Sequence, residues 1–112
     1  MKYLVEDCDD PADPVHDYAE AKQIVRQVLG SHPSVRQAAM FGSFVRGEQK
    51  DSSDVDLLLH FDEKDAFEAI GIGLDLAEEL GRDVDMLTTL RGAQSSFIEN
   101  LKREGRLIYR RD

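Results

Sequence analysis

The feature that most constrains the fold of this 112-residue chain is one short segment, residues 55–61 (VDLLLHF). Its near-continuous run of large apolar residues is typical of a strand that lies deep in a β-sheet. Asp54 stands immediately before the run, and Asp56 is its second residue. Because side chains alternate between the two faces of a strand, these two carboxylates leave the same face, roughly 6.5–7 Å apart at Cα. The chain must therefore build a sheet that carries two adjacent acidic groups.

Helical and strand periodicities alternate along the rest of the chain. Asp17 followed by Glu20 fits the start of a helix with a capping box. We expect, in order, a helix over 17–30, a strand over 35–41, the strand over 55–61, a helix over 65–80, a strand over 84–87, a helix around 97–101 that ends at Gly105, and a strand over 107–109. This order predicts an α/β (α+β) domain with a small mixed β-sheet of three to four strands flanked by helices.

The helix predicted over 65–80 repeats apolar residues at intervals of three to four. One stripe consists of Phe67, Ile70, Leu74, Ala77 and Leu80, and acidic residues oppose it. A stripe of this kind normally faces the core. We therefore expect these five side chains to pack against the sheet.

Length and composition limit the remaining possibilities. A chain of this size has room for one domain, and the five acids and two prolines of residues 1–14 predict an acidic arm ahead of a single domain over 15–112. The 23 acidic and 14 basic residues leave a net charge of −9, which argues against generic binding to nucleic acid. The longest apolar runs fall well short of the roughly 20 residues of a membrane span. With Cys8 as the single cysteine, a reduced, cytoplasmic protein is expected.

Three aspartates are candidate metal ligands. The like charges of Asp54 and Asp56 repel one another on their shared strand face unless a cation lies between them. Mg²⁺ prefers oxygen ligands, and a pair of such ions is the usual arrangement for in-line phosphoryl chemistry. Asp85, in another apolar strand, could converge on the same ions. Asp83 competes with Asp85 for this role, because Asp83-Val84-Asp85 puts both acids on one strand face.

A glycine-rich turn precedes the acidic pair. In residues 42–47 (GSFVRG), Gly42 allows close approach of the backbone to a ligand, Ser43 supplies a hydroxyl, and Arg46 supplies a guanidinium. Backbone N–H groups and an arginine suit phosphate oxygens. Turn geometry alone would also explain the glycine, and a helix cap would explain the serine. Lys50 is a weaker candidate for contact with a triphosphate.

In combination, these features resemble a known family. Gly42 and Ser43, ten further residues, Asp54 and Asp56, and then Asp85 some thirty residues later are similar to the signature of the DNA polymerase β-type nucleotidyltransferase superfamily. The chain is similar to the minimal nucleotidyltransferase (MNT) branch of that superfamily, at residues 41–47, 53–59 and 80–88. The likeness spans about residues 17–109.

The resemblance implies a polymerase β-like fold and an enzyme. Asp54 and Asp56 would hold Mg²⁺, with two ions in the site, and Asp85 would help to orient and deprotonate the attacking hydroxyl. The Gly-Ser pair and the arginine would hold the phosphates of ATP, the substrate. The physical reading agrees, because such a site positions and screens charge while an oxygen attacks the α-phosphorus.

The resemblance also implies a partner, since the chain is too short to hold a separate acceptor-binding domain. In the MNT branch, the small transferase accompanies a HEPN ribonuclease toxin, transfers AMP to a tyrosine of that toxin, and forms a complex with it. An antitoxin of this kind is the leading hypothesis. The alternatives are a non-catalytic module that blocks its partner sterically, and a transferase that acts on a small molecule or an RNA end.

Overall fold

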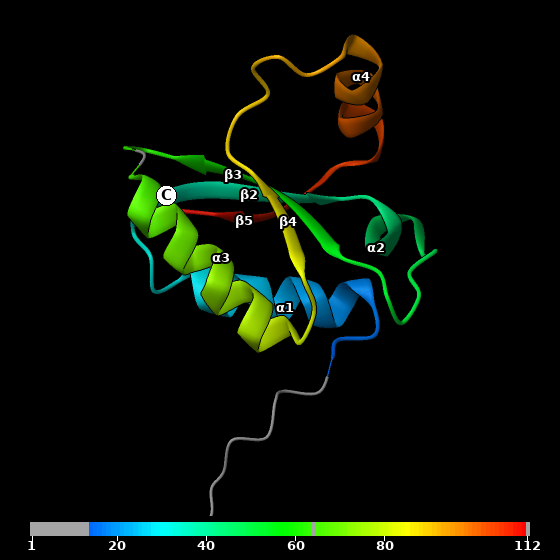
Figure 1. Cartoon of the computed structure of the whole chain (residues 1–112), viewed down its shortest axis with the longest axis horizontal. Coiled ribbons are helices and arrows are strands. Elements are labelled where there is room, and N and C mark those ends of the chain that lie inside the picture. The colour runs from blue at the N-terminus through cyan, green and yellow to red at the C-terminus, as the bar shows by residue number, and fades with distance from the viewer. Residues whose placement is uncertain (1–13, 64, 112) are drawn as a thin grey trace, which may run out of the picture.

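The computed structural model describes residues 14–63 and 65–111, and it shows one four-stranded sheet with helices packed beside it (Figure 1). The elements are α1 (Tyr18–Leu29), β2 (Val35–Phe41), α2 (Ser43–Arg46), β3 (Val55–Phe61), α3 (Ala66–Leu80), β4 (Val84–Leu87), α4 (Ser95–Glu104) and β5 (Arg106–Arg110). The strand order is β4-β3-β2-β5. The predicted mixed α/β sheet is therefore confirmed. The four-residue helix α2 was missing from the expected order, and the last strand is longer than predicted.

The sheet is mixed because β3 has one antiparallel and one parallel neighbour. β2 runs antiparallel to both β3 and β5, whereas β3 and β4 are parallel and are joined through α3. A parallel pair needs such a crossover, and a helix is its usual form. The parallel pairing matters for the site, because it brings the beginnings of β3 and β4 to the same end of the sheet.

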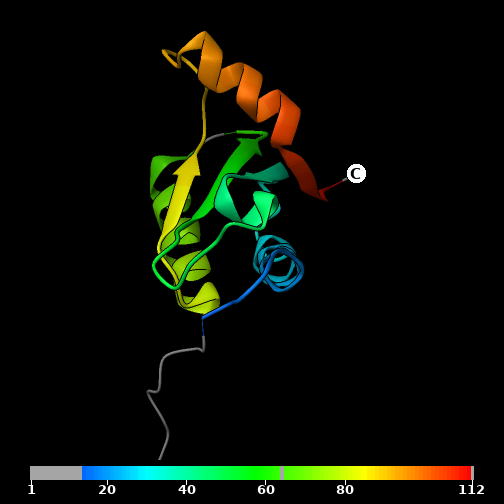
Figure 2. The ribbon, with the colours of Figure 1, turned by 90° about the vertical axis from the view of Figure 1, so that its right-hand side faces the viewer.

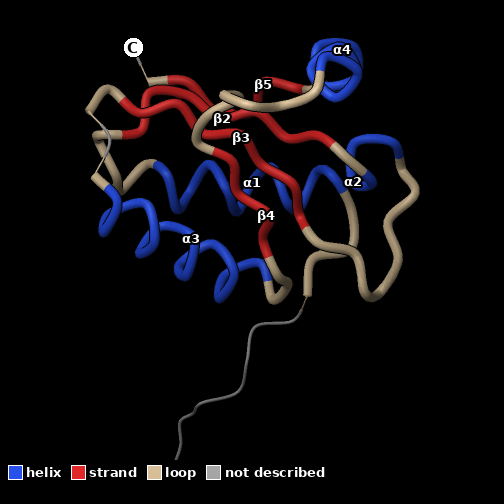
Figure 3. The backbone as a smooth tube through the Cα atoms, turned by 45° about the horizontal axis from the view of Figure 1, so that its top comes forward, coloured by secondary structure: helices blue, strands red, loops and turns tan. Residues whose placement is uncertain are grey.

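Helices α1 and α3 cover one face of the sheet, which we call the closed face (Figure 3). Along β3, alternate residues Val55, Leu57, Leu59 and Phe61 are buried on this face. The helix α1 begins as predicted, because the side chain of Asp17 accepts a hydrogen bond from Glu20 N–H at 2.9 Å. The opposite face, here the open face, carries the intervening residues of β3 and is the face on which the site lies.

The expected core face of α3 is wrong in most of its members. Phe67, Ile70 and Leu74 are 88%, 60% and 67% exposed, and the buried residues are instead Ala69, Ile72, Leu76 and Leu80. Only Leu80 belongs to both sets. The helix is apolar around most of its circumference, so two stripes compete for the sheet, and periodicity alone does not choose between them.

Helix α4 stands away from the rest of the molecule (Figures 1 and 2). Leu101 is its one buried hydrophobic residue, and the ring of Phe97 meets that of Phe41 edge-on, with centroids 5.8 Å apart. The helix thus lies over the end of the open face without joining the main core.

Val15, which precedes α1, packs into the core of the domain. This residue is buried, and its N–H donates to the carbonyl of Leu80 at 3.0 Å. The predicted acidic arm lies almost wholly outside the described residues. Each helix in residues 14–63 and 65–111 is too short or too polar to span a bilayer.

Candidate active site

The centre of the site is a pair of aspartates on neighbouring strands. In the parallel pairing of β3 and β4, Asp56 lies opposite Asp85, and Val55 lies opposite Val84. Neighbouring strands are about 4.8 Å apart, and both aspartates occupy the open face because Val55 is buried on the closed one. Two carboxylates about thirty residues apart in the sequence are thereby held on adjacent strands.

The register also bears on the choice between the two candidate acids of the second strand. Asp85 pairs with Asp56, whereas Asp83 lies ahead of β4 and its carbonyl accepts a hydrogen bond from Val55 N–H at 3.0 Å. The geometry thus favours Asp85 as the third acid of the site. The backbone of Asp83 instead joins the beginnings of β3 and β4 through this hydrogen bond.

Asp56 is the most perturbed acid of the site. The pKa of Asp56 is raised to about 6, first by partial burial and then by the negative charges of Asp85 and Asp54, while Arg46 opposes the shift. Asp54 itself is exposed and immediately precedes β3. The three predicted acids are therefore electrostatic neighbours, and their pooled charge favours a cation at this place.

The donor chemistry of these acids fits a hard, oxygen-seeking cation such as Mg²⁺. Within the described residues, however, no three His, Cys, Asp or Glu side chains are gathered closely enough to form a complete ligand set. The structure brings the acids to one face at one end of the sheet without closing a cage. The ligand roles of Asp54, Asp56 and Asp85 remain predictions.

Gly42 lies directly against Asp56. At the end of β2, Phe41 pairs with Asp56, and the next residue, Gly42, adopts φ +81° and ψ −155°. A Cβ atom at Gly42 would lie 2.0 Å from Asp56 Oδ2. Both the dihedral angles and the close approach require glycine here. The group that comes close to Gly42 here is the side chain of Asp56, and the predicted approach of a phosphate to Gly42 stays a prediction.

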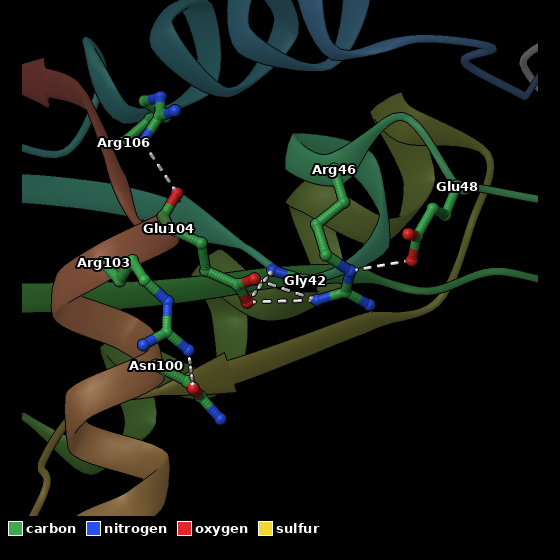
Figure 4. Close-up of polar contacts among 7 residues, drawn as sticks. All are labelled: Gly42, Arg46, Glu48, Asn100, Arg103, Glu104 and Arg106. Atoms are coloured by element: carbon green, nitrogen blue, oxygen red, sulfur yellow. Dashed lines mark hydrogen bonds and ion pairs between the residues drawn. The ribbon is translucent and has the colours of Figure 1, made fainter.

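The remaining predicted phosphate ligands follow on α2. Ser43 begins this short helix and is half-buried, and Arg46 ends it. The guanidinium of Arg46 donates to Glu48 Oε1 through Nε at 2.8 Å and to both carboxylate oxygens of Glu104 through Nη1 at 3.1 Å (Figure 4). These hydrogen bonds raise the pKa of Arg46. The positive charge of Arg46 also acts on Asp56, and its predicted contact with phosphates stays a prediction.

Glu104 is a site residue that the sequence did not reveal. It ends α4, and its Oε1 accepts hydrogen bonds from Gly42 N–H at 3.3 Å and from Arg46 Nη1, which also donates to Oε2 (Figure 4). Its charge also contributes to the raised pKa of Asp56. Nothing in the local pattern of α4 marks this residue, because the contact joins positions 62 residues apart.

Arg82 is a second residue whose role emerged only in the structure. Its guanidinium donates to the carbonyls of Lys50, Asp51 and Ser53 at 2.9–3.1 Å and lies over the ring of Phe44. These bonds hold the loop that leads into Asp54. Lys50, the weaker candidate for a phosphate contact, therefore contributes its backbone to this loop, and its side chain is exposed.

A pocket of about 350 Å³ opens beside the acids, between the end of β4 and α4. Asp85 lies in its wall together with the aromatic rings of Phe41 and Phe97, and the loop over 89–93 completes it. A small planar group could rest on these rings while its polar atom meets Asp85. The site thus has a polar side, where Gly42 N–H and Arg46 offer hydrogen-bond donors, and an apolar side beside Asp85.

Comparisons with known proteins agree with this geometry. Residues 23–112 match the family described as "Polymerase beta, Nucleotidyltransferase". A relative from Methanocaldococcus jannaschii, named as a candidate protein adenylyltransferase, is 40% identical over 70 residues, which cover 62% of this chain and 74% of the relative.

Two solved structures share the fold. One is a toxin–antitoxin complex with AMP-PNP, matched at 22% identity and a TM-score of 0.66 over 81% of this chain and 74% of that one. The other is the Shewanella oneidensis tri-AMPylated HEPN toxin in complex with its MNT antitoxin, matched at 19% identity and a TM-score of 0.60 over 83% of this chain and 72% of that one. With the family match over most of its length, and with acids, glycine and arginine gathered at one end of a four-stranded mixed sheet, the chain belongs to the polymerase β nucleotidyltransferase family.

Proposed function

We propose that this protein is an Mg²⁺-dependent adenylyltransferase antitoxin, which transfers AMP from ATP to a tyrosine of a HEPN ribonuclease toxin and forms a complex with it. The observation that carries the proposal is the meeting of Asp56 and Asp85 in register on the open face, directly beside Gly42 and Arg46. In this proposal the phosphates bind beside Gly42 and Arg46, and the attacking hydroxyl lies beside Asp85.

Each residue has a distinct task in the proposed reaction. Gly42 N–H, Ser43 and Arg46 bind phosphate oxygens and orient the triphosphate. Bound to Asp54 and Asp56, Mg²⁺ would supply positive charge to the reacting phosphate and the leaving group. Asp85 accepts the proton of the tyrosyl hydroxyl as its oxygen attacks the α-phosphorus. The bond from the α-phosphorus to the bridging oxygen breaks, and pyrophosphate leaves.

The nucleotide and the acceptor are supported by the related proteins. The Methanocaldococcus relative is named for protein adenylylation, one structural neighbour contains AMP-PNP, and another contains an AMPylated HEPN toxin. The pocket beside Asp85 adds support from this chain, because Phe41 and Phe97 offer an aromatic wall that suits a tyrosine ring.

The exposed face of α3 supports a protein partner. Phe67, Ile70 and Leu74 form an uncovered apolar stripe, and the charged residues of α3 are all acidic. A second copy of this chain would bring like charges together across such an interface. The stripe therefore fits a toxin surface with apolar residues bordered by Lys or Arg.

The central test is co-expression with a HEPN protein from the same genome, followed by mass spectrometry of that protein. The intact chain is expected to add the mass of AMP to a tyrosine, and Asp54→Ala with Asp56→Ala to abolish the addition. Asp51→Ala, which removes an exposed acid from the adjoining loop, is the matched control and should retain the transfer. If the double variant still protects cells from the toxin, the antitoxin acts by steric blocking and the enzymatic proposal is wrong.

The partner surface has its own test. Leu74→Glu should prevent co-elution with the HEPN protein, because it adds charge to the apolar stripe. The fold should survive, since Leu74 is exposed. Gln27→Glu adds the same charge to an exposed position on α1 and should leave the complex intact. Equal co-elution of both variants would place the interface elsewhere.

A further inference from the structure

Glu104 occupies the place that the proposed function gives to a phosphate. Its carboxylate accepts hydrogen bonds from Gly42 N–H at 3.3 Å and from Arg46 Nη1 at 3.1 Å to each oxygen (Figure 4). The side chain is 24% exposed, so it is partly enclosed between α2 and α4. The two donors expected to bind the nucleotide are thus already bound to an anion of the protein itself.

A carboxylate and a phosphate can each accept hydrogen bonds from these same donors, so they compete for them. Both are oxyanions that accept charge-assisted hydrogen bonds from a guanidinium and from backbone amides. Gly42 has a single N–H, which can donate well to one acceptor at a time. A phosphate oxygen that takes this hydrogen bond must therefore displace Glu104.

The surrounding charge makes simultaneous occupancy unfavourable. Glu104 is close enough to Asp56 to act on it electrostatically, and Asp54 and Asp85 add to the negative charge. Arg46 is the one cation that opposes this charge among the groups acting on Asp56 in the described chain. A triphosphate that entered beside an undisplaced Glu104 would face the repulsion of this whole group.

Within residues 14–63 and 65–111, the helix that carries Glu104 has few other contacts to hold it. Apart from Glu104, its contacts with the body of the protein are centred on Leu101 and on the ring of Phe97 against Phe41. Glu104 can therefore leave Gly42 through a shift of this helix that does not disturb the core. Phe97 would move with it, and Phe97 lines the pocket that contains Asp85.

We propose that Glu104 is an internal phosphate surrogate, which holds Gly42 N–H and Arg46 in the nucleotide-free protein and is displaced by a phosphate of the incoming nucleotide. This inference rests on the proposed function, because it takes a nucleoside triphosphate as the ligand. It adds that the protein lowers its own affinity for nucleotide, and that nucleotide binding reshapes the Asp85 side of the site. The acceptor would accordingly enter after the nucleotide.

The test is a set of equilibrium titrations with Mg²⁺-ATP and with tripolyphosphate alone, in which calorimetry measures the dissociation constants. Glu104→Ala and Glu104→Gln should each bind both ligands more tightly than the unaltered protein, by about tenfold, because no internal carboxylate has to be displaced. Two controls separate this effect from general charge. Glu99→Gln removes an exposed acid from the same helix, and Glu48→Gln removes the other partner of Arg46 without touching Gly42. Both should change the dissociation constant less than about threefold.

Amide NMR of the same proteins reports the displacement directly. In the unaltered protein, tripolyphosphate should shift the signals of Gly42 and of residues 95–104, and Glu104→Ala should shift the α4 signals in the same direction without ligand. Weaker binding by Glu104→Ala would overturn the inference, because Glu104 would then serve to position Arg46 for the phosphate. Equal tightening by Glu99→Gln would overturn it as well. Failure of every protein to bind ATP or tripolyphosphate would instead contradict the proposed function.

Discussion

The aspartates at the two ends of strand β3 lie in opposite electrostatic environments. Asp54 immediately precedes the strand and Asp56 lies near its beginning, whereas Asp62 immediately follows it. Asp62 accepts a hydrogen bond from Arg36 at 2.9 Å and another from Arg111. Although its desolvation acts in the opposite direction, these two arginines lower the pKa of Asp62.

At the other end, burial and the neighbouring acids raise the pKa of Asp56 to about 6, and Arg46 is shared with Glu48 and Glu104. The negative charge at one end of β3 is therefore neutralised by two arginines, whereas the acids at the other end retain an excess of negative charge. A carboxylate whose pKa is raised by burial and by neighbouring acids is typical of a functional site.

The largest effect should come from Asp56→Asn. We expect AMP transfer to fall by at least about a thousandfold, because the variant removes a ligand charge from the unbalanced end. The same change should raise the melting temperature of the protein in EDTA, since it relieves like-charge repulsion. Initial rates with labelled ATP and thermal melts provide the two measurements. A variant that kept a tenth of the activity would exclude Asp56 from the catalytic group.

A smaller loss is expected from Gly42→Ala. The new Cβ would lie 2.0 Å from Asp56 Oδ2 at a φ of +81°, so the variant should lose about 1–3 kcal/mol of stability and about a hundredfold in transfer rate. Urea unfolding and initial rates would measure both.

Gly47→Ala is the matched control for this prediction. Gly47 has a similar φ of +73°, but a Cβ there meets nothing within 4 Å. It should lose about 1 kcal/mol from backbone strain alone. If the two alanine variants are equally impaired, the close approach to Asp56 has no functional weight.

The pH dependence of stability should sharpen the contrast further. Because the pKa of Asp56 is raised in the folded protein, its ionisation costs nothing below about pH 4, costs progressively more as the pH rises to about 6, and costs the full amount above that. Asp56 is partly solvated, so we expect a full cost of about 1 kcal/mol.

The measurement is urea unfolding of the metal-free protein and of Asp56→Asn from pH 4 to pH 7. The advantage of the variant should grow with pH across this range. A constant difference between the two proteins would show that Asp56 has an ordinary pKa.

The smallest effect is expected at the balanced end of the strand. Asp62→Asn should lower the melting temperature slightly, and this difference should shrink in high salt, because the ion pairs of Asp62 with Arg36 and Arg111 are at the surface. Transfer activity should remain that of the unaltered protein. A large loss of activity in Asp62→Asn would show that the two ends of the strand are coupled.

The local features of this protein were predictable from sequence. The apolar run of β3 and the start of α1 at Asp17 each depend on residues close together in the chain, and the structure has both as predicted. The acids and the arginine were also recognisable, because the family motif is compact. Their roles remain predictions.

The face of α3 and the position of Glu104 were decided by the tertiary structure. Both stripes of α3 satisfy the helical period, so only packing against the sheet determined that Ile72 and Leu76 are buried and that Ile70 and Leu74 are exposed. The same holds for the register that sets Asp85 against Asp56, and for the contact of Glu104 with Gly42. Periodicity and capping are properties of neighbours in sequence, whereas register, burial and charge balance arise from segments that meet only when the chain is folded.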